Sequence, residues 1–203
     1  MSKQFFLTLE ADSMTQETQF TDLREVKWEL AIMLYPLKQN DGKNACRVYY
    51  PDGSYDDVRQ RCDTMRDELL KRYFVNLKKA ESIAIKCPDY PRKRRVCIKL
   101  EDDITLVPLI CREAPRRNAG SMGYVIMEWL YDVKQAEDGG TLLQFYEDHK
   151  GVHIMQKYGS ATQQFAFARQ LERCYQQDAE YRQMREEQRR QRDSKTHIGH
   201  HKD

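Results

Sequence analysis

The sequence predicts an α+β protein in which several helices pack a small antiparallel sheet and a long charged helix ends the chain. Segments with helical periodicity and β-prone runs follow one another in an irregular order, which is typical of α+β folds. The β-prone runs in the centre are adjacent and joined by short turns, as antiparallel strands are and doubly wound parallel strands are not. Apolar residues make up 40% and charged residues 33% of the chain, so part of the helical surface is expected to lie in solvent.

The chain length bounds the domain organisation. A chain of 203 residues can bury a core of its own without help from disulfides or metal. We expect a globular α+β domain over residues 1–160 and a C-terminal helix over residues 161–193, packed in its first part and projecting in its second. Residues 194–203, which include HIGHH, are expected to form a disordered tail.

The first 80 residues are predicted to form two strands and two helices. KQFFLTLEA has the composition of a strand, and NACRVYY is a second strand that the turn PDG ends. Between them we expect a helix ended by Pro36, because apolar residues recur at three- and four-residue steps at Phe20, Leu23, Val26, Leu30, Met33, Leu34 and Leu37. The second helix has Ser54 and Asp57 as a capping pair and an apolar face made of Val58, Cys62, Met65, Leu69 and Tyr73.

From Ser82 to Arg112 the chain is β-prone. Three consecutive antiparallel strands are predicted for SIAIKC, RRVCIKLE and ITLVPLICR. Pro108, inside the third run, has no N–H to donate to a neighbouring strand. That strand is therefore expected to lie at an edge of the sheet, or to be bulged there.

Helices are predicted for most of the remaining chain. GYVIMEWLYDV can place its apolar residues on one helical face, although a continuous apolar run also suits a buried strand. TLLQFYEDH is expected to form a short helix that Gly151 ends. The last helix is expected to begin at Ser160, with Gln163 completing a capping box, and to continue on charge pairs to about Arg192.

The distribution of charge indicates where a binding site would lie. The net charge of +2 gives no whole-molecule attraction for nucleic acid or anionic lipid, so any polyanion site has to be local. Residues 81–120 hold 9 basic and 6 acidic side chains, whereas residues 1–80 hold 13 of each and residues 121–203 hold 12 and 13. We predict a nucleic-acid-binding patch in which phosphates offset the mutual repulsion of a cationic run, formed by Arg92, Lys93, Arg94 and Arg95 and supported by Lys99, Arg116 and Arg117.

Two other interpretations of the cationic run remain open. It can be a solvated strand end whose charge is compensated by the acidic turn at residues 101–103. It also resembles the short basic nuclear-import signals of eukaryotic and viral proteins, since PRKRRV is a proline followed by cations. That resemblance implies a nuclear location if the host is eukaryotic.

The sequence shows no motif typical of an enzyme. His149 and His153 have the spacing of helical metal ligands, but Gly151 breaks the helix that would align them. The six cysteines are scattered along the chain, and three lie in apolar runs, so reduced core thiols are expected. No catalytic residue, metal or cofactor is therefore predicted.

The function expected from these observations is that of a non-enzymatic nucleic-acid-associated accessory or regulatory protein. The alternative is a protein-binding adaptor or inhibitor that acts through the C-terminal helix, by binding a partner or by self-association. The apolar stretch in the first residues is too short for the core of a signal peptide. No run approaches the roughly 18 apolar residues of a membrane helix. An intracellular, cytoplasmic protein without a membrane partner is expected.

Overall fold

The computed structural model describes residues 19–39, 42–87, 95–101, 104–113, 120–146 and 151–198, with the backbone alone for residues 180–198. The strands are β1 (Met33–Lys38), β2 (Asn44–Tyr49), β3 (Tyr55–Val58), β4 (Ile98–Glu101), β5 (Ile104–Ile110), β6 (Met122–Ile126), β7 (Leu130–Gln135), β8 (Thr141–Phe145) and β9 (Val152–Ile154). The helices are α1 (Cys62–Arg72), α2 (Leu77–Lys86) and α3 (Tyr158–Ile198), with short 3-10 turns η1 (Trp28–Leu30) and η2 (Met127–Trp129). The predicted α+β class is confirmed.

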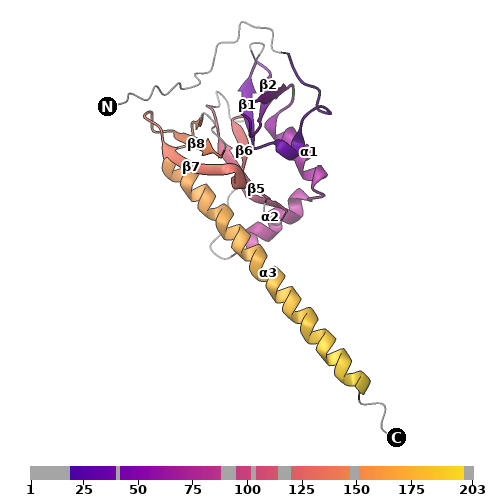
Figure 1. The fold of residues 1–203 in the computed structure, drawn as a ribbon. Helices are drawn as coiled ribbons and strands as arrows, with labels where there is room; N and C mark the ends of the chain where they lie inside the picture. Colours follow the sequence, from indigo (N-terminus) through magenta and orange to yellow (C-terminus); the bar gives the residue numbers. More distant parts are fainter. Residues whose placement is uncertain are drawn as a thin grey trace.

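The strands form two antiparallel sheets (Figure 1). The larger sheet has the order β3-β2-β1-β6-β5-β4, and the smaller has the order β7-β8-β9. Within the larger sheet, β1, β2 and β3 pair in sequence and so do β4, β5 and β6, and the central pairing of β1 with β6 joins the two sets. The helices α1 and α2 connect the two edge strands, β3 and β4. The turn η2 leads directly from β6 into β7 and therefore connects the two sheets.

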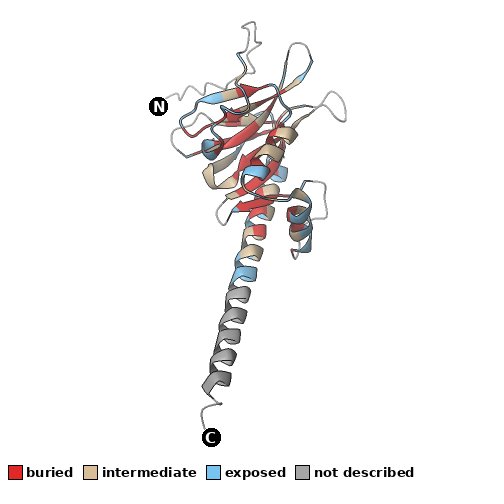
Figure 2. Cartoon of the chain, turned by 90° about the vertical axis from the view of Figure 1, so that its right-hand side faces the viewer, coloured by how far each residue is buried: buried red, intermediate tan, exposed pale blue. Residues whose placement is uncertain are grey.

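Both faces of the six-stranded sheet are covered. One face packs against α1 and η1 in a core that includes Trp28, Leu34, Val48, Met65, Leu69 and Leu106. The other face packs against the three-stranded sheet and the first half of α3 in a core that includes Met33, Val107, Val125, Leu143, Phe165 and Leu171. Figure 2 shows that burial is concentrated in this sheet and in the helical segments that contact it.

Several predicted elements of the first half are confirmed. NACRVYY forms β2, and the PDG turn leads from it into β3. The helix with the Cys62, Met65 and Leu69 stripe is α1. Its predicted cap is wrong, because Asp57 is a buried residue of β3 that accepts two hydrogen bonds from Arg47. KQFFLTLEA lies outside the described residues.

Three predicted helices are wrong because the apolar runs are strands. The stripe expected over residues 20–37 contains only the turn η1 and then becomes β1. GYVIMEWLYDV is divided among β6, η2 and β7, and TLLQF forms β8. β1 and β6 lie in the sheet that is covered on both faces and are apolar at successive positions, so their sequences also satisfy a helical stripe.

SIAIKC is not a strand but the second half of α2. The side chain of Asn76 caps this helix by accepting a hydrogen bond from the N–H of Lys79 at 3.1 Å. Ala80 and Ala84, four residues apart, are the buried positions of the helix. Of the three central strands predicted, RRVCIKLE and ITLVPLICR are confirmed as β4 and β5.

The prediction that Pro108 marks an edge strand is wrong for β5, which pairs with β4 on one side and β6 on the other. The reason for that prediction, the missing N–H of proline, still applies at Pro108 itself. β4 pairs no further along β5 than Leu106, and the N–H of Ile110, which points to the same side as the Pro108 nitrogen, bonds the side chain of Gln156. Pro108 therefore lies where β5 has no strand beside its nitrogen.

The helix α3 begins at Tyr158, two residues before the predicted start at Ser160. Its buried positions recur at three- and four-residue steps at Ala161, Phe165, Ala168 and Leu171. These four residues belong to the same core as both sheets.

Candidate nucleic-acid interface

The antiparallel order brings six cations from distant parts of the sequence to one end of the six-stranded sheet. The register pairs Lys38 of β1 with Asn44 of β2, Cys46 with Val58 of β3, and Ile110 of β5 with Met122 of β6. The connections at this end are therefore those after β1, β3 and β5 and those before β2, β4 and β6. We call this the basic end, because its described cations are Lys38, Lys43, Arg59, Arg61, Arg95 and Arg112.

Most of these cations face solvent. Lys38, Lys43, Arg59, Arg61 and Arg95 are exposed, and Arg112 is half-buried. Described carboxylates nearby are fewer: Glu113 follows Arg112, and Asp63 lies 3.4 Å from the guanidinium of Arg61. An open surface with this excess of positive charge has the character that attracts a polyanion.

The opposite end of the sheet has a different charge pattern. Its strand connections carry mostly carboxylates among the described residues, namely Glu29, Asp52, Glu101 and Glu128, with Lys27 as a cation. Glu29 and Glu101 both lie close enough to Tyr73 to contribute, after burial, to the raised pKa of its hydroxyl. Among the described strand connections of this sheet, the excess of positive charge thus lies at the basic end.

The predicted site residues fall into three groups. Arg95 is exposed at the basic end, where its carbonyl accepts a hydrogen bond from the Gln164 side chain at 3.0 Å. Five others, Arg92, Lys93, Arg94, Arg116 and Arg117, lie outside the described residues. The described residues that flank them, Arg95 on one side and Glu113 and Gly120 on the other, belong to the basic end.

Lys99 does not belong to this surface, and its predicted role as a contact is corrected. Its side chain is only 6% exposed, and its ammonium lies 3.4 Å from a carboxylate oxygen of Glu172 on α3. The same ammonium lies 3.4 Å from the hydroxyl of Thr105. Strand alternation turns Lys99 toward the core that α3 covers, so its charge is compensated inside the protein.

Arg112 and Asn44 join two of the connections at the basic end. The guanidinium of Arg112 donates to the side-chain oxygen of Asn44 at 2.9 Å. Gly120, with φ of 62°, packs so close to this amide that an added Cβ would lie 3.1 Å from its oxygen. The end of β5, the start of β6 and the start of β2 are therefore held together where the cations gather.

Arg47 and Asp57 form a second polar feature, just inside the basic end. Arg47 donates to both carboxylate oxygens of Asp57, at 2.8 and 2.9 Å, and its guanidinium stacks 3.7 Å from the ring centroid of Tyr55. The cation of Arg47 is thus engaged by Asp57, and Tyr55, 51% exposed, remains accessible on the edge strand β3. Sequence reasoning missed this pair, because only the strand register places Arg47 opposite Asp57.

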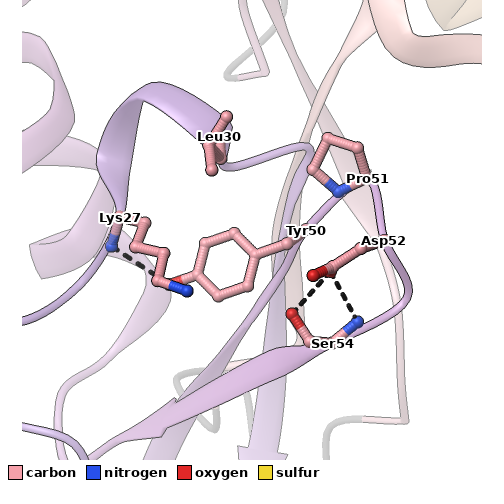
Figure 3. Close-up of a pocket in the computed structure, with 6 residues that line it drawn as sticks. All are labelled: Lys27, Leu30, Tyr50, Pro51, Asp52 and Ser54. Carbon is pink, nitrogen blue, oxygen red and sulfur yellow. Dashed lines mark hydrogen bonds between the residues drawn. The ribbon is translucent and has the colours of Figure 1, made fainter.

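A hollow at the opposite end of the sheet is lined by Lys27, Leu30, Tyr50, Pro51, Asp52 and Ser54 (Figure 3). Asp52 accepts hydrogen bonds from the N–H and the hydroxyl of Ser54, and this lowers the pKa of its carboxyl. A carboxylate held ionised in this way is a weak general base. The hollow therefore offers a small surface in which the apolar Leu30, Tyr50 and Pro51 lie beside polar side chains.

Other chemistry is limited within the described part of the chain. No group of three or more His, Cys, Asp or Glu side chains there has the geometry to hold a metal ion. His153 lies 3.1 Å from the carboxylate of Asp138, and its predicted companion His149 lies outside the described residues. None of the helices formed by described residues combines the length and the apolar character needed to cross a membrane.

Comparisons of this chain with protein-family models, with curated proteins and with solved structures give no match.

Proposed function

We propose that the protein is a non-enzymatic nucleic-acid-associated accessory or regulatory protein that contacts the phosphate backbone through the basic end of its six-stranded sheet. The observation that carries the proposal is the convergence there of cations from the connections after β1, β3 and β5 and before β4. Arg92, Lys93, Arg94, Arg116 and Arg117 extend this surface in the proposal, because described residues of the basic end flank both segments.

The chemistry of the basic end favours contacts with phosphate rather than with bases. Exposed lysine and arginine side chains bind a polyanion by releasing condensed counterions, and this contribution to affinity does not depend on base sequence. Tyr55, which lies on β3 toward the other end of the sheet, has an exposed ring beside Arg47 on which an unpaired base can stack. We further propose an intracellular location, cytoplasmic, or nuclear in a eukaryotic host through the segment at residues 91–96.

The test is the salt dependence of binding to single- and double-stranded DNA and RNA of arbitrary sequence. Replacement of Arg94 and Arg95 by Ala is expected to weaken binding and to reduce the slope of log K against log salt by about 1 for each phosphate that the variant no longer neutralises. The matched control replaces Lys78 and Lys79, exposed residues of α2, by Ala, since it removes the same charge elsewhere. Binding without salt dependence, or an equal weakening in both variants, contradicts the proposal.

A second candidate, an adaptor or inhibitor that acts through the C-terminal helix, is supported by the burial pattern of α3. The last of its buried described side chains is Leu171, and the helix continues to Ile198. Gln176, Gln177, Asp178 and Ala179 are exposed. A long charged helix that extends past its own packing surface is suited to a protein partner or to pairing with a second copy.

Deletion of residues 178–203 separates the two candidates, because it leaves the packed residues of α3 in place. Loss of self-association or of a protein partner, with nucleic-acid binding intact, supports the adaptor. Loss of nucleic-acid binding with association intact supports a nucleic-acid role in which the C-terminal helix takes part, and contradicts the adaptor.

A further inference from the structure

The fold brings two cysteines that are separated in the sequence into direct contact. Cys46 lies in β2, and Cys62 is the first residue of α1. The thiol of Cys62 donates a hydrogen bond to the sulfur of Cys46, with the two sulfurs 2.9 Å apart. The thiol of Cys46 donates in turn to the carbonyl of Arg47 at 3.8 Å. Both cysteines are free, and their residues are 0% and 4% exposed.

The local topology holds this contact. Cys46 and Val48 alternate with Arg47 along β2, so both point toward the face of the sheet that α1 covers. Val58, which pairs with Cys46 across β2 and β3, is only four residues before Cys62. The first turn of α1 is therefore held against β2 by a short connection. A disulfide bond is about 2.05 Å long, so the two sulfurs have less than 1 Å to close.

We propose that Cys46 and Cys62 form a reversible disulfide when the protein meets a hydroperoxide. The thiolate of Cys62 attacks one oxygen of hydrogen peroxide, which breaks the O–O bond, releases hydroxide and leaves Cys62 as a sulfenic acid. The sulfur of Cys46 then attacks the sulfenic sulfur, loses its proton and forms the S–S bond, and one water leaves. The two thiols lose two electrons in total, and the peroxide accepts them. A dithiol reductant reverses the reaction by thiol–disulfide exchange.

Burial makes this reaction slow and dependent on local opening. Burial first, and the neighbouring Cys46 second, raise the pKa of the Cys62 thiol well above its ordinary value, so the reactive thiolate is scarce. Cys62 lies in the first turn of its helix, and its N-cap residue Arg61 makes no side-chain capping bond. Fraying of that turn gives a small oxidant access, whereas a bulky disulfide such as oxidised glutathione is excluded by size.

The disulfide would join β2 to α1, and each of its cysteines is the neighbour in sequence of an arginine described above. Cys46 precedes Arg47, and Cys62 follows Arg61 of the basic end. The crosslink closes a loop between residues 16 apart in the sequence. The lost freedom of the unfolded chain is expected to raise the Tm of the oxidised protein by about 6–12 °C.

The experiment treats the reduced full-length protein with hydrogen peroxide, blocks free thiols and digests with trypsin without reductant. Trypsin cleavage after Lys43, Arg47, Arg61 and Arg66 yields the peptides NACR and CDTMR, and each of the other four cysteines falls on a separate peptide. The expected product is NACR joined to CDTMR, two hydrogens lighter than the sum of the peptides and separated by dithiothreitol. The Tm is expected to rise on oxidation and to return on reduction.

The variants Cys46→Ser and Cys62→Ser are each expected to abolish both the linked peptide and the Tm increase, and Cys111→Ser is expected to keep both. Peptide mapping of the wild type needs no variant, so a misfolded variant does not remove the test. The proposal is overturned if peroxide yields only sulfinic acid, if the linked peptide forms only in urea, or if another pair of cysteines is joined instead.

Discussion

The ammonium of Lys99 on β4 and the carboxylate of Glu172 on α3 form a largely buried ion pair that fastens the first half of α3 to the six-stranded sheet. The two groups are 3.4 Å apart, and Thr105 of β5 donates its hydroxyl proton to the same carboxylate oxygen at 2.9 Å. The backbone N–H of Thr105 donates to both carboxylate oxygens of Glu128, each at 2.9 Å. One lysine and one threonine thus hold two glutamates from different elements.

Replacement of Lys99 by Met is expected to destabilise the protein by roughly 3 kcal/mol. The change leaves Glu172 without its cation inside the protein. Removal of one partner of a buried ion pair costs more free energy of unfolding than replacement of both partners. Urea denaturation measures the loss, and the double variant Lys99→Met with Glu172→Gln should recover a large part of it. Nucleic-acid affinity of the folded Lys99→Met protein should equal that of the wild type. A loss of nucleic-acid affinity without a loss of stability would show that Lys99 contacts the nucleic acid.

Glu128 is expected to make stability fall as the pH rises. Burial first, and the nearby Glu172 carboxylate as a smaller cause, raise the pKa of the Glu128 carboxyl to about 7 from an ordinary 4.5, although hydrogen bonds from backbone N–H groups oppose the shift. Because the folded pKa lies above the unfolded one, the stabilisation is fully present below about pH 4.5 and is lost as the pH rises through 7. Solvent screening of this half-buried group limits the loss to about 1–2 kcal/mol.

The variant Glu128→Gln isolates this effect. A neutral amide cannot ionise, so the stability difference between variant and wild type should shift in favour of the variant between pH 5 and pH 8. Chemical denaturation at several pH values measures both proteins, and titrating groups that do not interact with Glu128 cancel in the difference. A difference that stays constant with pH would show that Glu128 is ionised throughout.

Arg47 is expected to be more important for stability than its position near the surface suggests. Asp57, whose side chain is 3% exposed, receives both hydrogen bonds of this guanidinium. Arg47→Ala leaves that carboxylate buried and unpaired, which costs roughly 3–5 kcal/mol. Arg47→Lys keeps the charge but loses the two-point contact, so a smaller loss is expected in the same urea measurement. Equal losses for the two variants would contradict this account.

The elements that could be predicted from the sequence are those whose signals are local. The α1 stripe, the PDG turn and the strands β2, β4 and β5 depend on nearby residues alone. β1 and β6 cannot be told from helices by their sequence, because strands buried on both faces have the continuous apolar pattern that a packed helix also has. β8 alternates buried and half-buried residues, but a run of five residues is too short for its periodicity to decide between strand and helix. SIAIKC predicts a strand through its β-branched residues, but the chain forms a helix there that Asn76 caps.

The candidate site was predictable only in part for the same reason. The cationic run at residues 92–95 is visible in the sequence, but the convergence of Lys38, Arg59 and Arg95 on one end of the sheet requires the β1–β6 pairing. The burial of Lys99 likewise depends on α3 supplying Glu172 from 73 residues away. Charge can be counted along a chain, whereas its exposure follows from contacts between distant residues.

Phe74 holds a backbone conformation that favours glycine, so Phe74→Gly is expected to stabilise the protein. Its φ is 52°, and it lies just after α1, where its N–H bonds the carbonyl of Lys71 and the N–H of Val75 bonds that of Leu70. This is the Schellman arrangement, in which glycine usually occupies the left-handed position because a Cβ is strained there. The Phe74 side chain is 96% exposed, so its removal loses almost no packing. Relief of strain, offset by the greater freedom of glycine in the unfolded chain, should leave a gain of about 1 kcal/mol.

Urea denaturation measures the gain expected for Phe74→Gly, and Phe74→Ala, which keeps the Cβ, should show little or none. A destabilised Phe74→Gly variant would mean that the ring makes contacts in solution, for example with a second copy, which concentration-dependent sedimentation of the wild type would then reveal.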